Sequence, residues 1–166
     1  MGGRGASAGN SNVTPSRTKM YVKQTQNNDF YKNKYVKIDG KEVITDGFSI
    51  YSLNNAGIKE EGGVQLKEFI KGQFKILESD MKGQKVTYNS LNSLMNKPTT
   101  VSNYGVKAIK TQDENYGFDL KRVKQARTIL GKNTEYAYVK TGAYSSMIFR
   151  NKKGETGFLL PLRLKR

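Results

Sequence analysis

The sequence predicts a single α+β domain in which two helices pack on an antiparallel sheet, preceded by an N-terminal arm. Three observations predict this class. Apolar residues alternate with polar ones near the start and at the end of the domain, as in half-buried strands. Two segments between these have the spacing of amphipathic helices. Residues 1–18 are rich in Gly, Ser and Asn with hardly an apolar side chain, so we expect a disordered arm and a domain over 19–166.

The composition indicates a basic protein that binds a polyanion. Lysine and arginine number 29 against 14 acidic residues, a formal charge of +15, so the long-range field attracts nucleic acid. Cysteine and histidine are absent, which excludes disulfides, thiol nucleophiles, Cys/His zinc sites and histidine bases. We therefore expect a protein that is not an enzyme, with no catalytic residues, no metal site and no cofactor. No apolar run reaches the ~18 residues of a membrane span, so a cytoplasmic protein without a membrane partner is expected.

Strands joined by tight turns are predicted in YVKIDGKEVITDGFSIYSL, residues 35–53. Val36 and Ile38 alternate with polar neighbours. Asp39-Gly40 is a strong hairpin signal, because glycine accepts the positive φ of a primed turn, and Asp46-Gly47 repeats it. No helix is expected ahead of these strands.

The first predicted helix lies in GGVQLKEFIKGQFKILES, residues 62–79. Its apolar arc consists of Leu66, Phe69, Ile70, Phe74 and Leu77. A lysine stripe runs beside this arc, formed by Lys67, Lys71 and Lys75. Such a stripe is as typical of an ordinary solvated face as of a phosphate-binding surface.

The middle of the chain has weaker patterns. Strands are expected over 86–88 and 106–109, and the segment SLNSLMN, residues 90–96, predicts a short helix that stops before Pro98.

The second predicted helix lies in YGFDLKRVKQARTILGKN, residues 116–133. Asp119 is expected to cap its start and Gly131 to end it. Arg127 falls inside the apolar arc and must extend its charged end to solvent. The lysines on the opposite side are Lys121, Lys124 and Lys132.

Three strands are expected after this helix, in EYAYVKTG, YSSMIFRNKKGE and TGFLLPLRL. Chain ends usually fray, so the apolar run at the C-terminus predicts a strand that is docked in the sheet. The side chains expected to be buried there are Phe158, Leu160, Leu162 and Leu164.

These fragments, in this order, resemble the domains of bacterial DNA sliding clamps. In clamps a turn of the form ATDGHRL is followed by a helix, and the last domain closes with a helix, several strands and a terminal MPMRL. VITDGFSIY and FLLPLRL stand at the corresponding places here, and the matching pieces cover about residues 35–78 and 116–164. The start, MGGRGAS, is similar to that of proteins from phages and mobile elements of Gram-positive bacteria.

The resemblance implies a clamp-like role in the replication of a phage or mobile element. Clamp helices face DNA phosphates without reading bases, which implies that both lysine-rich helices contact the backbone. A single domain can encircle a duplex only as a closed homo-oligomer, by analogy of about six copies, or beside another clamp. Clamps also bind peptides of replication proteins in a groove, here within one chain or between subunits. The groove residues carried over are Thr45, Asp46, Gly47, Leu160, Pro161 and Leu162.

Two other functions stay open. Small size, basic charge and the mobile-element-like start also suit an anti-CRISPR or other anti-defence inhibitor that binds a host nucleoprotein or its guide RNA. A small basic nuclease is a further alternative, although no clustered carboxylates have metal-ligand spacing. Duplex DNA is the favoured nucleic acid, and RNA remains an alternative because backbone contacts dominate the binding of both.

Overall fold

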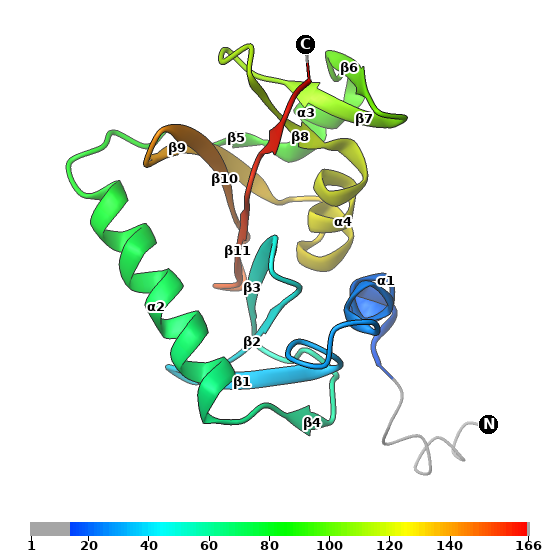
Figure 1. The fold of residues 1–166 in the computed structure, drawn as a ribbon, viewed down its shortest axis with the longest axis vertical. Coiled ribbons are helices and arrows are strands. Elements are labelled where there is room, and N and C mark those ends of the chain that lie inside the picture. Colours follow the sequence, from blue (N-terminus) through cyan, green and yellow to red (C-terminus); the bar gives the residue numbers. More distant parts are fainter. Residues whose placement is uncertain (1–13, 166) are drawn as a thin grey trace.

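The computed structural model describes residues 14–165 and confirms the α+β class (Figure 1). Over these residues there are four helices: the two predicted to pack on the sheet, the short one expected over 90–96, and one that was not expected. The helices are α1 (Ser16–Thr25), α2 (Val64–Met81), α3 (Leu91–Asn96) and α4 (Leu120–Leu130). The strands are β1 (Lys34–Ile38), β2 (Lys41–Thr45), β3 (Ser49–Leu53), β4 (Glu60–Glu61), β5 (Asn89–Ser90), β6 (Thr100–Asn103), β7 (Val106–Lys110), β8 (Tyr116–Asp119), β9 (Glu135–Thr141), β10 (Tyr144–Arg150), β11 (Thr156–Leu159) and β12 (Leu162–Arg163).

The strands form two sheets. The larger sheet has the order β4-β1-β2-β3-β11-β10-β9-β5, and the smaller one the order β12-β8-β7-β6. All pairs are antiparallel except β1 with β4. At the centre of the large sheet β3 pairs with β11, and Ile50 lies opposite Phe158. The beginning and the end of the described chain are therefore joined in the same sheet.

One arrangement occurs twice in the large sheet. Helix α1 is followed by the meander β1-β2-β3, and helix α4 by the meander β9-β10-β11. The last strands of the two meanders, β3 and β11, pair with each other. On each side of this pair, the middle strand of the meander comes next and its first strand follows. Sequence analysis did not identify this repeat.

Helices cover both faces of the large sheet. Helices α1 and α4 lie on one face and α2 on the other (Figure 1). Alternate strand residues supply the two cores: Tyr51 and Phe149 pack with α1 and α4, whereas Val43 packs beneath α2. The two helices that the sequence predicted to be lysine-rich are thus separated by the sheet.

Local signals account for several boundaries. Asp39 and Gly40 have φ of 51° and 79°, as a primed turn requires. The Asp119 carboxylate accepts the Lys121 amide N–H at 2.9 Å and caps α4, and Gly131 ends this helix with φ of 100°. These signals were identified correctly in the sequence.

A helix precedes the first strand, contrary to the prediction. The arm expected over 1–18 overlaps it, because α1 starts at Ser16 and Thr18 is fully buried, while residues 1–13 lie outside the described part of the chain. The buried side of α1 consists of Thr18, Tyr21 and Thr25. Two threonines and one tyrosine do not form the aliphatic repeat by which a helix is recognised.

The apolar C-terminal run is docked, but it forms two strands in different sheets. β11 lies between β3 and β10 in the large sheet, and β12 pairs with β8 in the small one. Leu159 is the fully buried residue, whereas the four side chains expected to be buried are only partly so. The strand expected over 86–88 is not formed, and β5 starts at Asn89.

Candidate nucleic-acid interface

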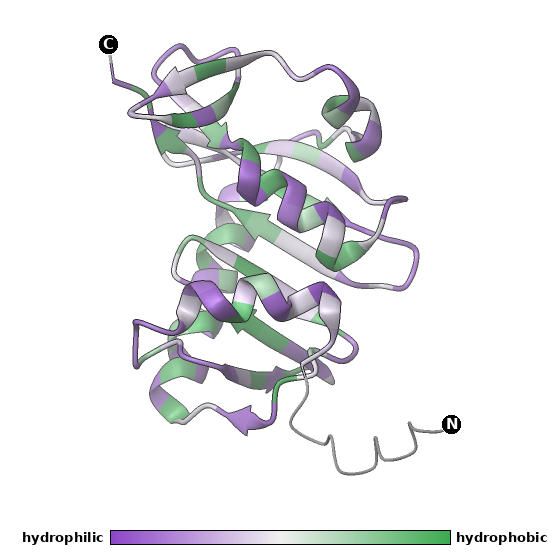
Figure 2. Cartoon of the chain, turned by 90° about the vertical axis from the view of Figure 1, so that its right-hand side faces the viewer, coloured by the Kyte–Doolittle hydropathy of each residue, from purple (hydrophilic) through white to green (hydrophobic). Residues whose placement is uncertain are grey.

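The face formed by α1 and α4 is the strongest candidate for binding a polyanion. The two helices contact each other, and the Gln125 side-chain amide donates to the Gln24 side-chain oxygen, Oε1, at 3.2 Å. Figure 2 looks onto this face and shows hydrophilic segments along both helices. The lysines exposed on the two helices are Lys19, Lys23, Lys121 and Lys124.

The charged residues within these two helices have one sign. Neither SRTKMYVKQT in α1 nor LKRVKQARTIL in α4 contains an acidic residue. Arg17 and Arg122 are engaged in ion pairs with the sheet, described below, so the lysines carry the charge that faces solvent. Adjacent cations without acidic neighbours raise the local concentration of polyanions.

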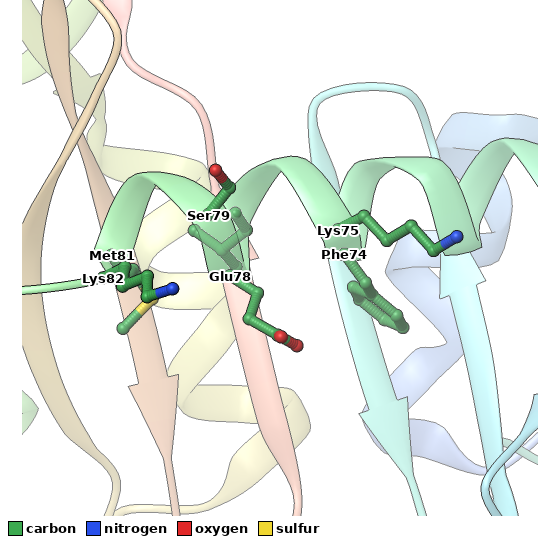
Figure 3. Close-up of a pocket in the computed structure, with 7 residues that line it drawn as sticks. Phe74, Lys75, Glu78, Ser79, Met81 and Lys82 are labelled. Atoms are coloured by element: carbon green, nitrogen blue, oxygen red, sulfur yellow. The ribbon is translucent and has the colours of Figure 1, made fainter.

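Helix α2 has a different charge pattern. Lys67, Lys71 and Lys75 are exposed as predicted, but the same helix holds three acidic residues, Glu68, Glu78 and Asp80, which leave it without net charge. Figure 3 shows Glu78 between Lys75 and Lys82 along a groove that Phe74 and Met81 help to line. These lysines therefore lie among acids and on the opposite face from α4.

Lys132 lies apart from both groups. It follows the end of α4, is exposed, and lines a hollow with Arg150 and Lys152. Arg127 is half-buried, and its guanidinium donates to the Asn92 side-chain oxygen at 3.1 Å. We expected its charged end to extend outward, because its Cα lies inside the apolar arc of the helix.

Two buried acids receive arginines from the helices. Arg17 of α1 bonds both oxygens of Glu155, which precedes β11, at 3.1 Å. Arg122 of α4 bonds Asp46, which precedes β3, at 2.5 Å. Each helix is thus tied to the turn that leads into the last strand of the other repeat. Residues 138 and 76 positions apart meet here, so no local signal in the sequence indicates either pair.

Glu155 is held in its charged form. It is 1% exposed, and burial by itself raises the pKa of a carboxyl group. The hydrogen bonds from the Asn54 amide N–H and the Asn151 side chain, together with the Arg17 guanidinium, outweigh burial and lower the pKa of Glu155 below its ordinary 4.5.

The turn before β3 also contacts α1. The Tyr21 hydroxyl donates to the Ser49 carbonyl oxygen at 2.9 Å, and the Ser49 hydroxyl donates to Asp46 at 3.1 Å. Burial raises the pKa of Tyr21 well above 10, so this hydroxyl remains a donor. Both helices are therefore anchored at the same turn.

The two segments assigned to a peptide groove meet within one chain. The Leu160 amide N–H donates to the Phe48 carbonyl oxygen at 2.9 Å, so the terminal segment runs beside the TDG turn. Thr45 and Asp46 are buried and bonded inside the turn. Gly47 and the terminal residues, Leu160, Pro161 and Leu162, are partly exposed. A groove here remains a prediction, and Phe48 is the exposed apolar side chain of this region that the sequence analysis missed.

Comparisons with known proteins identified no relative. No protein-family model, no curated protein and no solved structure matches the chain. Within residues 14–165, no helix has both the length and the apolar character needed to cross a membrane. The function is accordingly inferred from the geometry described above.

Proposed function

We propose that this protein is a non-enzymatic, clamp-like protein of a phage or mobile element that binds the phosphate backbone of nucleic acid, duplex DNA in the first place. It acts in the cytoplasm of a bacterial host. The binding surface is the face formed by α1 and α4. The observation that carries the proposal is the set of four exposed lysines on two adjacent helices that contain no acidic residue.

This surface differs from the one expected from the sequence. A duplex lying on α4 cannot also contact α2, because the large sheet separates the two helices. Lys19 and Lys23 of α1 therefore take the place of the α2 lysines, and Lys121 and Lys124 are retained. Lysine ammonium groups contact phosphates as point charges, which gives affinity without sequence preference.

The resemblance to sliding clamps remains part of this proposal. Clamps turn their helices toward DNA, and the lysines of α1 and α4 point away from the sheet on a shared face. A closed homo-oligomer, by analogy of about six copies, would bring this face to the inside of a ring. Sedimentation velocity with and without DNA tests this part, because a ring gives one defined oligomer. A monomer whose sedimentation coefficient increases only when a host nucleoprotein is added supports an anti-defence inhibitor instead.

The salt dependence of binding tests the surface itself. Four phosphate contacts predict a slope of about −3.6 for log affinity against log salt, or a loss of roughly 150-fold between about 50 and 200 mM. The double variant Lys23→Glu/Lys124→Glu should lower the slope to about −1.8 and weaken binding equally for unrelated duplexes. Fluorescence anisotropy with labelled duplex DNA measures the affinity and its slope with salt. The same measurement with a labelled RNA duplex shows which of the two nucleic acids is bound more tightly.

Helix α2 offers a control with the same change of charge. Lys67→Glu/Lys71→Glu alters net charge as much as the first pair does, but on the opposite face. If it weakens binding as strongly, net charge alone explains the affinity and the α1 and α4 face has no special role. If neither double variant weakens binding, neither lysine surface contacts the nucleic acid and the proposed face is wrong.

A further inference from the structure

The hairpin between β6 and β7 presents an exposed aromatic ring. Asn103 pairs with Val106, so the connection has two residues, Tyr104 and Gly105. Their φ angles are 52° and 78°, both in the left-handed region. Tyr104 is 76% exposed, so its ring is not held there by burial in a core.

Tyrosine is an unfavourable residue for this position. The β1–β2 hairpin has the same two-residue geometry, with φ of 51° and 79°, and its residues are Asp39 and Gly40. The remaining non-glycine residue with positive φ in the described chain is Asn33. Asn and Asp tolerate this conformation because their side chains bond the local backbone, whereas a bulky residue there is strained. An exposed ring held in a strained turn suggests a role other than stability.

One basic group lies beside the ring. The Lys165 ammonium lies 5.6 Å from the centroid of the Tyr104 ring. Asn103 holds the C-terminal segment in place: its side-chain oxygen accepts the Lys165 amide N–H at 2.9 Å, and its amide donates to the Arg163 carbonyl oxygen at 3.4 Å. The terminal segment thus places the Lys165 ammonium beside the hairpin tip.

A cavity joins the hairpin to α4. Its volume is about 480 Å³, and its lining includes Val106 and Lys107 of the hairpin together with Lys121 and Lys124 of α4. The one acid in its lining, Asp119, is the residue whose carboxylate caps the helix. Two of the lysines proposed to bind phosphates, Lys121 and Lys124, therefore line the same cavity as Gly105, the residue that follows Tyr104 in the turn.

We propose that Tyr104 stacks on an unpaired nucleobase, so that the protein holds single-stranded nucleic acid where its backbone leaves the α1 and α4 face. This inference rests on the proposed function and adds to the duplex a second kind of nucleic acid, an unpaired strand, held by a contact of its own. Lys107 contacts the phosphates next to the stacked base. Stacking tolerates every base, because each has a flat π face, and it suits a site in which nothing reads base edges.

The test compares a single-stranded oligonucleotide with a duplex of equal length. Tyr104→Ala should weaken binding of the single strand roughly 5- to 100-fold, the effect of losing one base–aromatic stack, and leave duplex binding unchanged within about twofold. Tyr104→Phe keeps the ring and should bind the single strand like the wild-type protein. Phe30→Ala removes another exposed ring, which packs on Phe69 of α2, and should have no effect.

Tyr104→Asn separates binding from folding. It places asparagine before Gly105, the preferred pair for a primed turn, so the melting temperature should stay or rise while affinity for the single strand falls as in Tyr104→Ala. A fall in both would mean that the ring supports the fold, and stacking would be refuted.

The outcomes distinguish the two proposals. If Lys23→Glu/Lys124→Glu loses affinity but the Tyr104 variants do not, or if Tyr104→Ala weakens single strand and duplex equally, base stacking is wrong and the α1 and α4 face stands. If only the Tyr104 variants lose affinity, the lysine face is wrong and stacking stands. A wild-type protein that binds neither nucleic acid overturns both.

Discussion

Glu155→Gln should destabilise the whole domain, because it breaks a buried ion pair between α1 and the centre of the large sheet. Glu155 is 1% exposed and accepts four hydrogen bonds: two from Arg17, one from the Asn54 amide N–H and one from the Asn151 side chain. Glutamine has nearly the same shape, but its side-chain NH2 group is a donor and would face groups that are themselves hydrogen-bond donors.

The magnitude follows from the burial of the pair. Breaking a buried pair by removing one partner costs about 3 to 5 kcal/mol. Arg17 is 28% exposed and can regain some hydration, so we expect the lower end, about 3 kcal/mol. For a domain of this size that lowers the melting temperature by roughly 6 to 12 °C. Urea unfolding followed by circular dichroism measures the change in free energy directly.

The pH dependence identifies the cause. Because the pKa of Glu155 is lowered in the folded state, its contribution is complete above the ordinary value of 4.5 and is lost as the pH falls through the folded pKa. The wild-type protein and the variant should therefore differ fully near neutral pH and converge in acid. A difference that stays constant with pH would refute the reasoning, since it would show that shape and not charge is responsible.

The surface provides a matched control. Glu135 forms an ion pair with Arg150 in which both side chains are about half exposed. Glu135→Gln should change stability by less than about 1 kcal/mol, because solvent screens such pairs.

Two further predictions concern the core. Deleting residues 158–166 should unfold the domain, because it removes Leu159 from the core and half of β11 from between β3 and β10; an unchanged melting temperature would contradict this. Tyr21→Phe should cost about 0.5 to 1.5 kcal/mol in urea unfolding, because it removes the hydrogen bond at 2.9 Å to the Ser49 carbonyl oxygen, which keeps the Thr45 hydroxyl as a donor at 2.7 Å; a neutral result would mean that water replaces the Tyr21 hydroxyl.

The elements predicted correctly are those with strong local signals. Asp39 and Gly40 specify their turn because both residue types tolerate the positive φ that it requires. Helices α2 and α4 have aliphatic residues at helical spacing. Helix α1 was missed because its buried side is Thr18, Tyr21 and Thr25. The Thr18 hydroxyl bonds the carbonyl oxygen of Ala56, in the segment after β3, and the Tyr21 hydroxyl bonds that of Ser49 in β3, and neither contact has a local signal in the sequence.

The site shows the same limit. The sequence indicated which lysines lie on the polar sides of two helices, and the structure confirms that Lys71 and Lys124 are exposed. It could not indicate that the sheet separates them, because this depends on the β3–β11 pair, which is non-local. Tyr104 was overlooked for a related reason, since an exposed tyrosine is unusual only once its φ angle is known.

The β3–β11 pair also bears on how the protein is made. Strand β3 ends at Leu53, but the strand that completes its hydrogen bonds begins at Thr156, 103 positions later (156 − 53). During synthesis on the ribosome, β1, β2 and β3 must wait with an unpaired strand edge until β11 has been added. Such an edge can pair with another nascent chain. A protein of this topology should therefore depend on chaperones or on slow expression for its yield, although its sheet has no open edge at this position once β11 has paired with β3.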